Sequence, residues 1–175
     1  MDQGIKSRPR YQPFRIDPAG TQHLIVTDQP SPPPGISGAA ELWTIAPHPG
    51  GQSFPTPAAL LASLPGHLAR QGPGFRLYAI GTEPFIWDVA YIATHAGLTE
   101  GELFLHHAGS LARRVHCIHC KTNTDRVTTN IVTCAGCGAN LLVRDHFSRR
   151  LRAFMGVQVD AETPGILPPI ETLYP

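Results

Sequence analysis

The chain has 175 residues, of which 42% are hydrophobic and only 15% are charged, and its formal net charge is +1. No apolar run approaches the ~18 residues of a membrane span, and the first residues lack a signal-peptide core, so we expect a cytoplasmic protein. The low charge, the 18 prolines and the 17 glycines favour a loop-rich fold whose surface is partly covered by partners.

Strand patterns recur through the first 110 residues. Residues 1–20 carry Pro9, Pro13 and Pro18 and predict an extended N-terminal arm. Short apolar runs bounded by Pro or Gly then predict four strands, at residues 23–27, 41–46, 75–80 and 102–106.

Helix patterns fall between the later strands. The pair Thr56-Pro57 predicts a hydroxyl cap and first helical residue, and Pro65 predicts a break or kink in the helix that follows. Its expected inward positions are Ala58, Leu61, Leu64 and Leu68. The second helix ends at Gly97, and its expected inward positions are Phe85, Val89, Ile92, Ala93 and Ala96. Strands alternating with helices indicate a parallel, three-layer α/β domain.

The third strand and its turn resemble a known family. Residues 77–85, Leu-Tyr-Ala-Ile-Gly-Thr-Glu-Pro-Phe, are similar to the end of the NAD(P) domain of ferredoxin reductases. Ile80 stands where that family has a cysteine beside the nicotinamide, and Thr82 stands where it has a proline. The glycine-rich turn that cradles a pyrophosphate is missing, since Thr27-Asp-Gln-Pro30 follows the first strand. We therefore expect residues 21–110 to form a degenerate reductase-like domain without cofactor-binding residues.

All four cysteines lie in two C-x-x-C pairs, Cys117/Cys120 and Cys134/Cys137, with thirteen residues between the pairs. Two such knuckles make a tetrahedral cage of four sulfurs, which fits Zn2+, or Fe in a rubredoxin-like site. We expect zinc in a structural role, because four thiolates leave no open position for water or substrate. Free dithiols and a pair of disulfides are the alternatives, and disulfides suit a secreted protein.

The residues around the cysteines predict a zinc ribbon at 111–157, followed by an extended tail at 158–175. Residues 121–133 predict a hairpin between the two pairs, and residues 139–144 predict the closing strand. Gly138 supplies a position without a Cβ just past the last ligand. His116 and His119 flank the first pair, and we expect them to tune the thiolates by donating imidazole N–H groups.

Charge is unevenly spread along the chain. Residues 111–152 hold eight Lys/Arg against two Asp, a net charge of +6, which leaves −5 for the remainder. A basic ribbon could bind nucleic acid or an acidic protein surface, and the near absence of aromatic residues that could stack on bases favours the protein. We expect four residues to dock a partner, because arginine grips carboxylates through two N–H groups: Arg144, His146, Arg149 and Arg150. No nucleophile–base pair stands out, so no catalytic residue is predicted.

A second resemblance is more specific. It rests on the cysteine ribbon together with the sequence Val143-Arg-Asp-His-Phe-Ser-Arg-Arg150. From about residue 20 to 165 the chain is similar to the DmmA-like small subunits of bacterial dimethylamine monooxygenase. That resemblance implies an accessory, non-catalytic subunit beside a haem oxygenase subunit and a flavin, [2Fe–2S] reductase subunit. In that family the complex uses NADPH and O2 to convert dimethylamine into methylamine and formaldehyde.

The resemblance thus implies that haem, FMN, [2Fe–2S] and NADPH belong to partner subunits, whereas the expectation of zinc in this chain comes from the cysteine spacing. Two alternatives stay open from the residues themselves. The first is a rubredoxin-like Fe(SCys)4 electron-transfer protein, and the second is a zinc-ribbon adaptor that binds nucleic acid.

Overall fold

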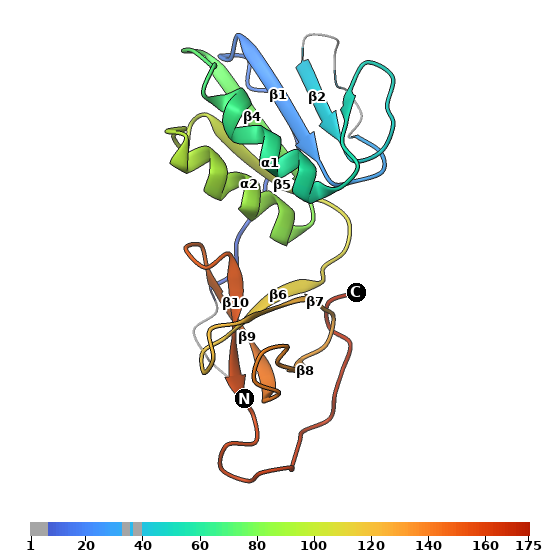
Figure 1. Ribbon diagram of the computed structural model, residues 1–175, viewed down its shortest axis with the longest axis vertical. Coiled ribbons are helices and arrows are strands. Elements are labelled where there is room, and N and C mark those ends of the chain that lie inside the picture. The colour runs from blue at the N-terminus through green and yellow to red at the C-terminus, as the bar shows by residue number, and fades with distance from the viewer. Residues whose placement is uncertain (1–6, 33–35, 37–39) are drawn as a thin grey trace. The chain divides into compact units, whose positions relative to one another are not determined.

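The structure, a computed structural model, describes residues 7–32, 36 and 40–175 of the chain. It divides into two compact units. We call Tyr11–Gly109 the α/β unit, and Ser110–Pro175 with the described residues of Met1–Arg10 the cysteine unit. Figure 1 traces the chain through the elements of both units.

The α/β unit contains a five-stranded sheet. Its strands are β1 (Gln22–Thr27), β2 (Ala40–Thr44), β3 (Gln52–Ser53), β4 (Phe75–Gly81) and β5 (Leu103–His107). All of them are parallel, in the order β3-β2-β1-β4-β5. The mixed α/β class with a parallel sheet is therefore confirmed, and the short strand β3 is the one that the sequence did not predict.

Helix α1 (Pro57–Leu68) begins as predicted, since the Thr56 hydroxyl accepts a hydrogen bond from the backbone N–H of Ala59. The expected break at Pro65 does not occur, because the helix continues for three more residues. Of the four predicted inward positions, Leu64 and Leu68 are confirmed, Leu61 packs partly buried against the same core, and Ala58 is wrong. Leu60, Leu64 and Leu68 are buried at a spacing of four residues, whereas Ala58 is exposed and Leu61 is half-buried.

Helix α2 (Glu83–His95) buries five side chains against the sheet: Phe85, Ile86, Val89, Ala90 and Ala93. They pack with Leu24, Val26, Leu77 and Ala79 of β1 and β4 in one core that also holds the buried side chains of α1. Ala96 was expected inward and is exposed, because the helix has ended by that residue. Among the described residues, no helix has the length and apolar content needed to cross a membrane.

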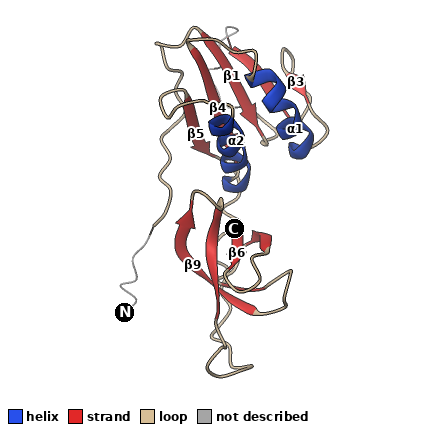
Figure 2. Ribbon diagram, turned by 60° about the vertical axis from the view of Figure 1, so that its left-hand side comes forward, coloured by secondary structure: helices blue, strands red, loops and turns tan. Residues whose placement is uncertain are grey.

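Both helices lie on the same face of the sheet (Figure 2), so the expectation of helices on both faces is wrong. Helix α1 connects β3 to β4 and α2 connects β4 to β5, and both connections cross the sheet in one direction. Right-handed crossovers in one direction place their helices on one face. The opposite face buries Ile25 and Tyr78 beneath Phe14 and Ile16, from the extended segment before β1.

The cysteine unit contains a second five-stranded sheet. Its strands are β6 (Arg113–Cys117), β7 (Asn123–Val127), β8 (Ile131–Thr133), β9 (Asn140–Ser148) and β10 (Ala153–Gln158). The order is β7-β6-β10-β9-β8, with β6 and β10 parallel and the other neighbours antiparallel. Buried apolar side chains from these strands form its core, among them Val115, Leu141, Phe147 and Phe154.

The predicted hairpin within residues 121–133 is wrong. Strand β7 pairs with β6, and β8 pairs with β9, so neither strand pairs with the other. Each C-x-x-C turn reverses the chain by itself and therefore forms the tip of its own hairpin. The predicted closing strand at 139–144 is confirmed as β9, which runs four residues further, to Ser148.

The C-terminal tail returns to the cysteine unit after β10. The backbone N–H groups of Leu173 and Tyr174 both donate to the carbonyl of Thr128, each at 2.9 Å. The side chain of Asn130 accepts from the N–H of Glu171 at 2.8 Å and donates to the carbonyl of Pro169 at 3.1 Å. Tyr174 is buried, so the end of the tail is anchored.

Candidate metal centre

The two cysteine pairs lie at the tips of the two hairpins. Cys117 is the last residue of β6, and Cys120 lies in the turn before β7. Cys134 directly follows β8, and Cys137 lies in the turn before β9. The β6–β10–β9 pairing therefore holds two turns of equal spacing beside each other.

The four sulfurs form one cluster. All four Sγ atoms lie within 4.8 Å of one another. The Sγ atoms of Cys117 and Cys137 are 3.9 Å apart, and those of Cys120 and Cys134 are 3.5 Å apart. A tetrahedral Zn–S4 centre with bonds of about 2.3 Å has S···S edges of roughly 3.8 Å. The donor set therefore fits a zinc ion, and it fits an iron of similar geometry.

Backbone conformation in the turns brings the sulfurs together. Lys121 and Gly138, which each follow the second cysteine of a pair, have φ of 67° and 74°. Gly136 is required for a different reason. A Cβ at this position would lie 2.4 Å from Thr122 Oγ1 and 3.1 Å from the sulfur of Cys120. The second turn can thus approach the first only because residue 136 has no side chain.

Hydrogen bonds from the turns change the pKa values of the cysteine thiols. The hydroxyl and backbone N–H of Thr122 lower the pKa of Cys120 to about 6. The N–H of Cys137, and then that of Gly136, lower the pKa of Cys134. The N–H of Ala139 acts to lower the pKa of Cys137, but desolvation and the adjacent sulfurs raise it to about 11. Without a metal, Cys120 therefore ionises easily, whereas Cys137 keeps its proton.

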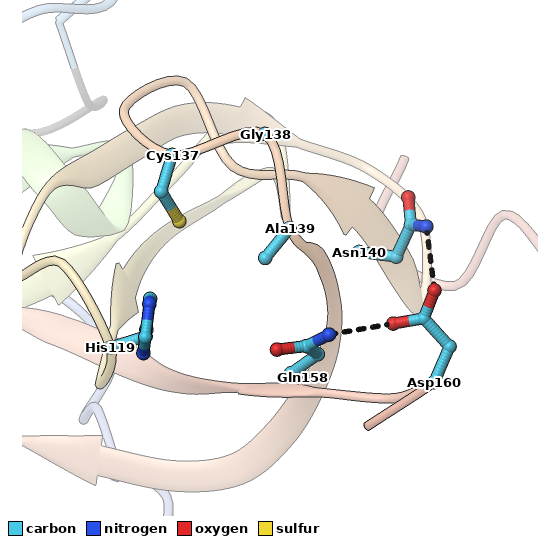
Figure 3. A pocket seen from close by; sticks show the side chains of 7 residues that line it. All are labelled: His119, Cys137, Gly138, Ala139, Asn140, Gln158 and Asp160. Atoms are coloured by element: carbon cyan, nitrogen blue, oxygen red, sulfur yellow. Dashed lines mark hydrogen bonds between the residues drawn. The ribbon is translucent and has the colours of Figure 1, made fainter. Parts of the chain in front are cut away.

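A pocket of about 370 Å³ opens beside Cys137, which is the exposed member of the cluster. Figure 3 shows its sulfur and the ring of His119 along one side of this pocket. Farther along the wall, Asn140 and Gln158 each donate to the Asp160 carboxylate at 3.2 Å. These hydrogen bonds, that of Asn140 foremost, lower the pKa of Asp160. One ligand of the cluster is thus reached from solvent through a polar pocket.

Comparison with known proteins identifies the chain's relatives. The family model described as "Dimethylamine monooxygenase subunit DmmA-like, C-terminal domain" matches residues 114–157, which include all four cysteines. The "Heme-dependent oxidative N-demethylase delta subunit" of Ectopseudomonas mendocina (strain ymp) is 36% identical over 159 residues, covering 90% of this chain and 91% of that protein. The chain belongs to the DmmA-like family. No solved structure matches it significantly.

The two histidines near the cysteines take different positions in this DmmA-like chain. The Nδ1 of His116 lies 2.9 Å from Asn123 Oδ1, across the β6–β7 pair. This ring nitrogen is therefore bonded to an amide oxygen and not to a thiolate. His119 lies in the pocket beside Cys137.

The predicted docking residues follow one another along β9 and the turn after it. Arg144 and His146 lie on β9 between Val143 and Phe147, where the pairing of β9 with β10 is irregular. His146, Arg149 and Arg150 are exposed, and Arg144 is half-buried.

A buried cation in the cysteine unit was not predicted from the sequence. The Arg113 guanidinium lies 3.8 Å from the ring centre of Phe154 and 3.7 Å from that of Tyr174. Its Nη1 is 3.0 Å from Asp145 Oδ1, and Arg8 also pairs with this carboxylate. Desolvation acts to raise the pKa of Asp145, but the hydrogen bonds from Arg8 and Arg113 hold it below its ordinary value. Arg113 thus joins β6, β9, β10 and the tail.

The crevice where a dinucleotide fold binds its cofactor is occupied by the chain's own side chains. Such folds bind ligands where the strand order reverses, at the carboxyl ends of the strands, and here that point lies between β1 and β4. Asp28 follows β1, and its Oδ1 accepts hydrogen bonds from the N–H of Thr82 at 3.1 Å and from Gln29 at 2.7 Å. A Cβ on Gly81 would lie 1.9 Å from the same oxygen.

Proposed function

We propose that this chain is a zinc-binding, non-catalytic assembly subunit of a cytoplasmic NADPH- and O2-dependent dimethylamine monooxygenase. It would hold the haem oxygenase subunit and the flavin, [2Fe–2S] reductase subunit together. The single observation that carries the proposal is the 36% identity with the delta subunit of an oxidative N-demethylase over 90% of the chain. Because that similarity includes both units, it concerns the chain's role as a whole.

Zinc fits this role because the cluster is a closed cage. Cys117, Cys120, Cys134 and Cys137 would complete a tetrahedral shell, and such an ion crosslinks two hairpins without binding substrate. Metal binding would supply much of the folding free energy of this small sheet. We assign His116 and His119 as outer residues that tune the thiolates through imidazole N–H groups, and we assign no catalytic residue.

The other residues divide into parts with separate roles. We propose an arm at 1–20, a degenerate ferredoxin-reductase-like domain at 21–110, a zinc ribbon at 111–157 and a tail at 158–175. The parallel order of the first sheet supports the reductase-like domain. The Asp28 carboxylate, where a pyrophosphate would need to lie, supports the absence of a cofactor there.

Partner binding would use the basic strip of the ribbon. Arg144, His146, Arg149 and Arg150 lie on β9 and the adjoining turn. Arginine side chains there can pair with carboxylates on an oxygenase or reductase surface.

Co-expression tests the proposal. The tagged chain, produced with the haem and reductase subunits of the same organism, should purify as a complex with fixed stoichiometry. Reduction of the haem by NADPH should slow when this chain is omitted, and the chain alone should not demethylate dimethylamine. Purification of the chain without any of those subunits, or demethylation by the chain alone, would refute the proposal.

A rubredoxin-like electron carrier is the second candidate. The observation that favours it is the exposure of Cys137 in an open pocket, which would bring a redox partner close to an iron ion. Elemental analysis and the visible spectrum separate the two candidates. Zinc gives a colourless protein, whereas Fe(SCys)4 gives a red one with absorption that bleaches on reduction.

A further inference from the structure

Exposed apolar side chains gather on the C-terminal tail. Seven large apolar side chains stand exposed among the described residues, and four of them lie in the eight residues 166–173. Ile166, Leu167, Ile170 and Leu173 are 66%, 37%, 61% and 48% exposed. Single exposed apolar residues need no explanation, but a cluster of this kind marks an interaction surface. We call these four side chains the tail ridge.

The backbone beneath the tail ridge is held at both ends. On one side the N–H of Gly165 donates to the Asp160 carboxylate at 3.3 Å. On the other side Asn130 bonds to both Pro169 and Glu171, and Tyr174 is buried beside Arg113. A fixed backbone lowers the entropy cost of binding. The chain therefore presents these apolar side chains on an ordered support.

The sequence of the tail ridge limits how a partner can bind it. Pro168 and Pro169 have no N–H, so no partner strand can form a regular ladder along this segment. Segments rich in proline are recognised instead through their side chains, in apolar grooves lined by aromatic residues. The partner should therefore bind the tail ridge through an apolar groove and not through the edge of a β-sheet.

Charge around the tail ridge limits the partner further. Residues 158–175 contain Asp160, Glu162 and Glu171, and no Lys or Arg. Asp160 is buried among hydrogen-bond donors, but Glu162 and Glu171 are exposed. Glu162 also borders a hollow of about 480 Å³ whose walls include Val159, Ile166 and Leu167. Such a hollow fits the alkyl stem of a Lys or Arg whose charged group reaches Glu162.

We infer that the tail ridge docks into an apolar groove, with Lys or Arg at its rim, on another subunit of the demethylase. This inference rests on the proposed assembly role and adds the surface that performs it. The surface is acidic and apolar, and it is distinct from the basic strip on β9. The two surfaces therefore suit partners of opposite charge, as expected for a chain that joins two different subunits.

Co-purification with the haem and reductase subunits tests the docking surface. The test variant is the full chain with both Ile166→Asp and Ile170→Asp. The matched control is Tyr91→Asp, which places the same charge at an exposed apolar side chain outside the tail, since Tyr91 lies on α2 and is 44% exposed. We expect the double variant to bind one of the two subunits at least about tenfold more weakly, and the control to bind like the unaltered chain. Circular dichroism and metal content should be equal in all three proteins.

Photo-crosslinking gives the second measurement. A photoreactive phenylalanine analogue at position 170 should join the chain to an apolar peptide with nearby Lys or Arg on one of those subunits. If the unaltered chain binds both subunits and the double variant binds them equally well, the docking surface is wrong while the assembly role stands. A crosslink to a second copy of this chain also overturns the inference. If the unaltered chain binds neither subunit, the proposed function itself fails.

Discussion

The carboxylate of Asp28 accepts hydrogen bonds from both the backbone N–H and the hydroxyl of Thr82, the residue directly before α2. Asp28 follows β1 and Thr82 follows β4, so the contact joins the two central strands at their carboxyl ends. A carboxylate at a helix N-terminus is stabilised by the helix dipole. Helix N-termini attract phosphate groups for the same reason.

Replacement of Asp28 should destabilise the α/β unit. Asp28→Ala removes the acceptor for Thr82 and leaves the space beside Gly81 empty, and we expect a loss of about 1–2 kcal/mol in the free energy of unfolding. Asp28→Asn keeps the shape and one acceptor oxygen but removes the charge, so its loss should be smaller. Urea unfolding followed by circular dichroism measures both. Equal stability of Asp28→Ala and the unaltered chain would contradict the role given to this contact.

The same contact predicts that the chain alone does not bind NADPH. The Asp28 carboxylate would repel a pyrophosphate at the N-terminus of α2, and the turn after β1 supplies no glycine-rich cradle. Calorimetric titration of the full chain with NADPH should therefore show no heat of binding at millimolar concentrations. Saturable binding that Asp28→Ala strengthens would show that the crevice still accepts a nucleotide.

Local signals in the sequence predicted most elements of the α/β unit. Short apolar runs predicted four of its strands, and the Thr56-Pro57 pair predicted the start of α1. The placement of both helices on one face was not predicted, because it follows from the strand order and not from any single helix. Topology of that kind depends on contacts between residues far apart in the chain.

In the cysteine unit, the spacing of the cysteines predicted that they would meet, but the strand pairing around them was wrong. Each C-x-x-C turn is itself a hairpin turn, which spacing alone does not reveal. Arg113 is one of the eight Lys/Arg that make residues 111–152 basic, but it is buried between Phe154 and Tyr174. An arginine in a strand between apolar positions, with an aspartate elsewhere, is too common a pattern to identify such a contact.

The Arg113–Asp145 pair should make the stability of the cysteine unit depend on acid pH. Asp145 has a lowered pKa in the folded chain, so its contribution is present above the unfolded value of about 3.9 and is lost as the pH falls through the folded value. Asp145→Asn also leaves a buried guanidinium without its counter-charge, which should cost about 3 kcal/mol at neutral pH. Unfolding followed from pH 7 to pH 2 should show a constant difference between the two proteins down to about pH 4, and a difference that shrinks below that pH. A constant difference across that range would mean that the charge of Asp145 is unimportant.

The two glycines of the second cysteine turn should differ in their tolerance of alanine. Gly136→Ala places a methyl group against Thr122 and Cys120, so the sulfurs must move apart and zinc affinity should fall by about tenfold or more. Gly138→Ala meets no atom within 4 Å and has only the unfavourable φ of 74°, which costs about 1 kcal/mol. Competition with a chromophoric zinc chelator measures both affinities. A larger effect of Gly138→Ala would contradict the close approach of the two turns.

Removal of the metal should unfold the cysteine unit, and rebinding should depend on pH. A zinc ion requires four thiolates, and the pKa of Cys137 is raised to about 11, whereas that of Cys120 is lowered to about 6. At pH 7 Cys120 has already lost most of its proton, but Cys137 must release one when the ion binds. The apparent zinc affinity should therefore rise by about tenfold per pH unit, or more, between pH 6 and pH 8.

Titrations in buffers with different ionisation enthalpies count the protons released when zinc binds. Cys120→Ser removes a ligand that is already ionised, so it should weaken binding with little change in the number of protons released near pH 7, whereas Cys137→Ser should lower that number by about one. Equal proton counts in the two variants would show that the sulfurs do not differ in this way.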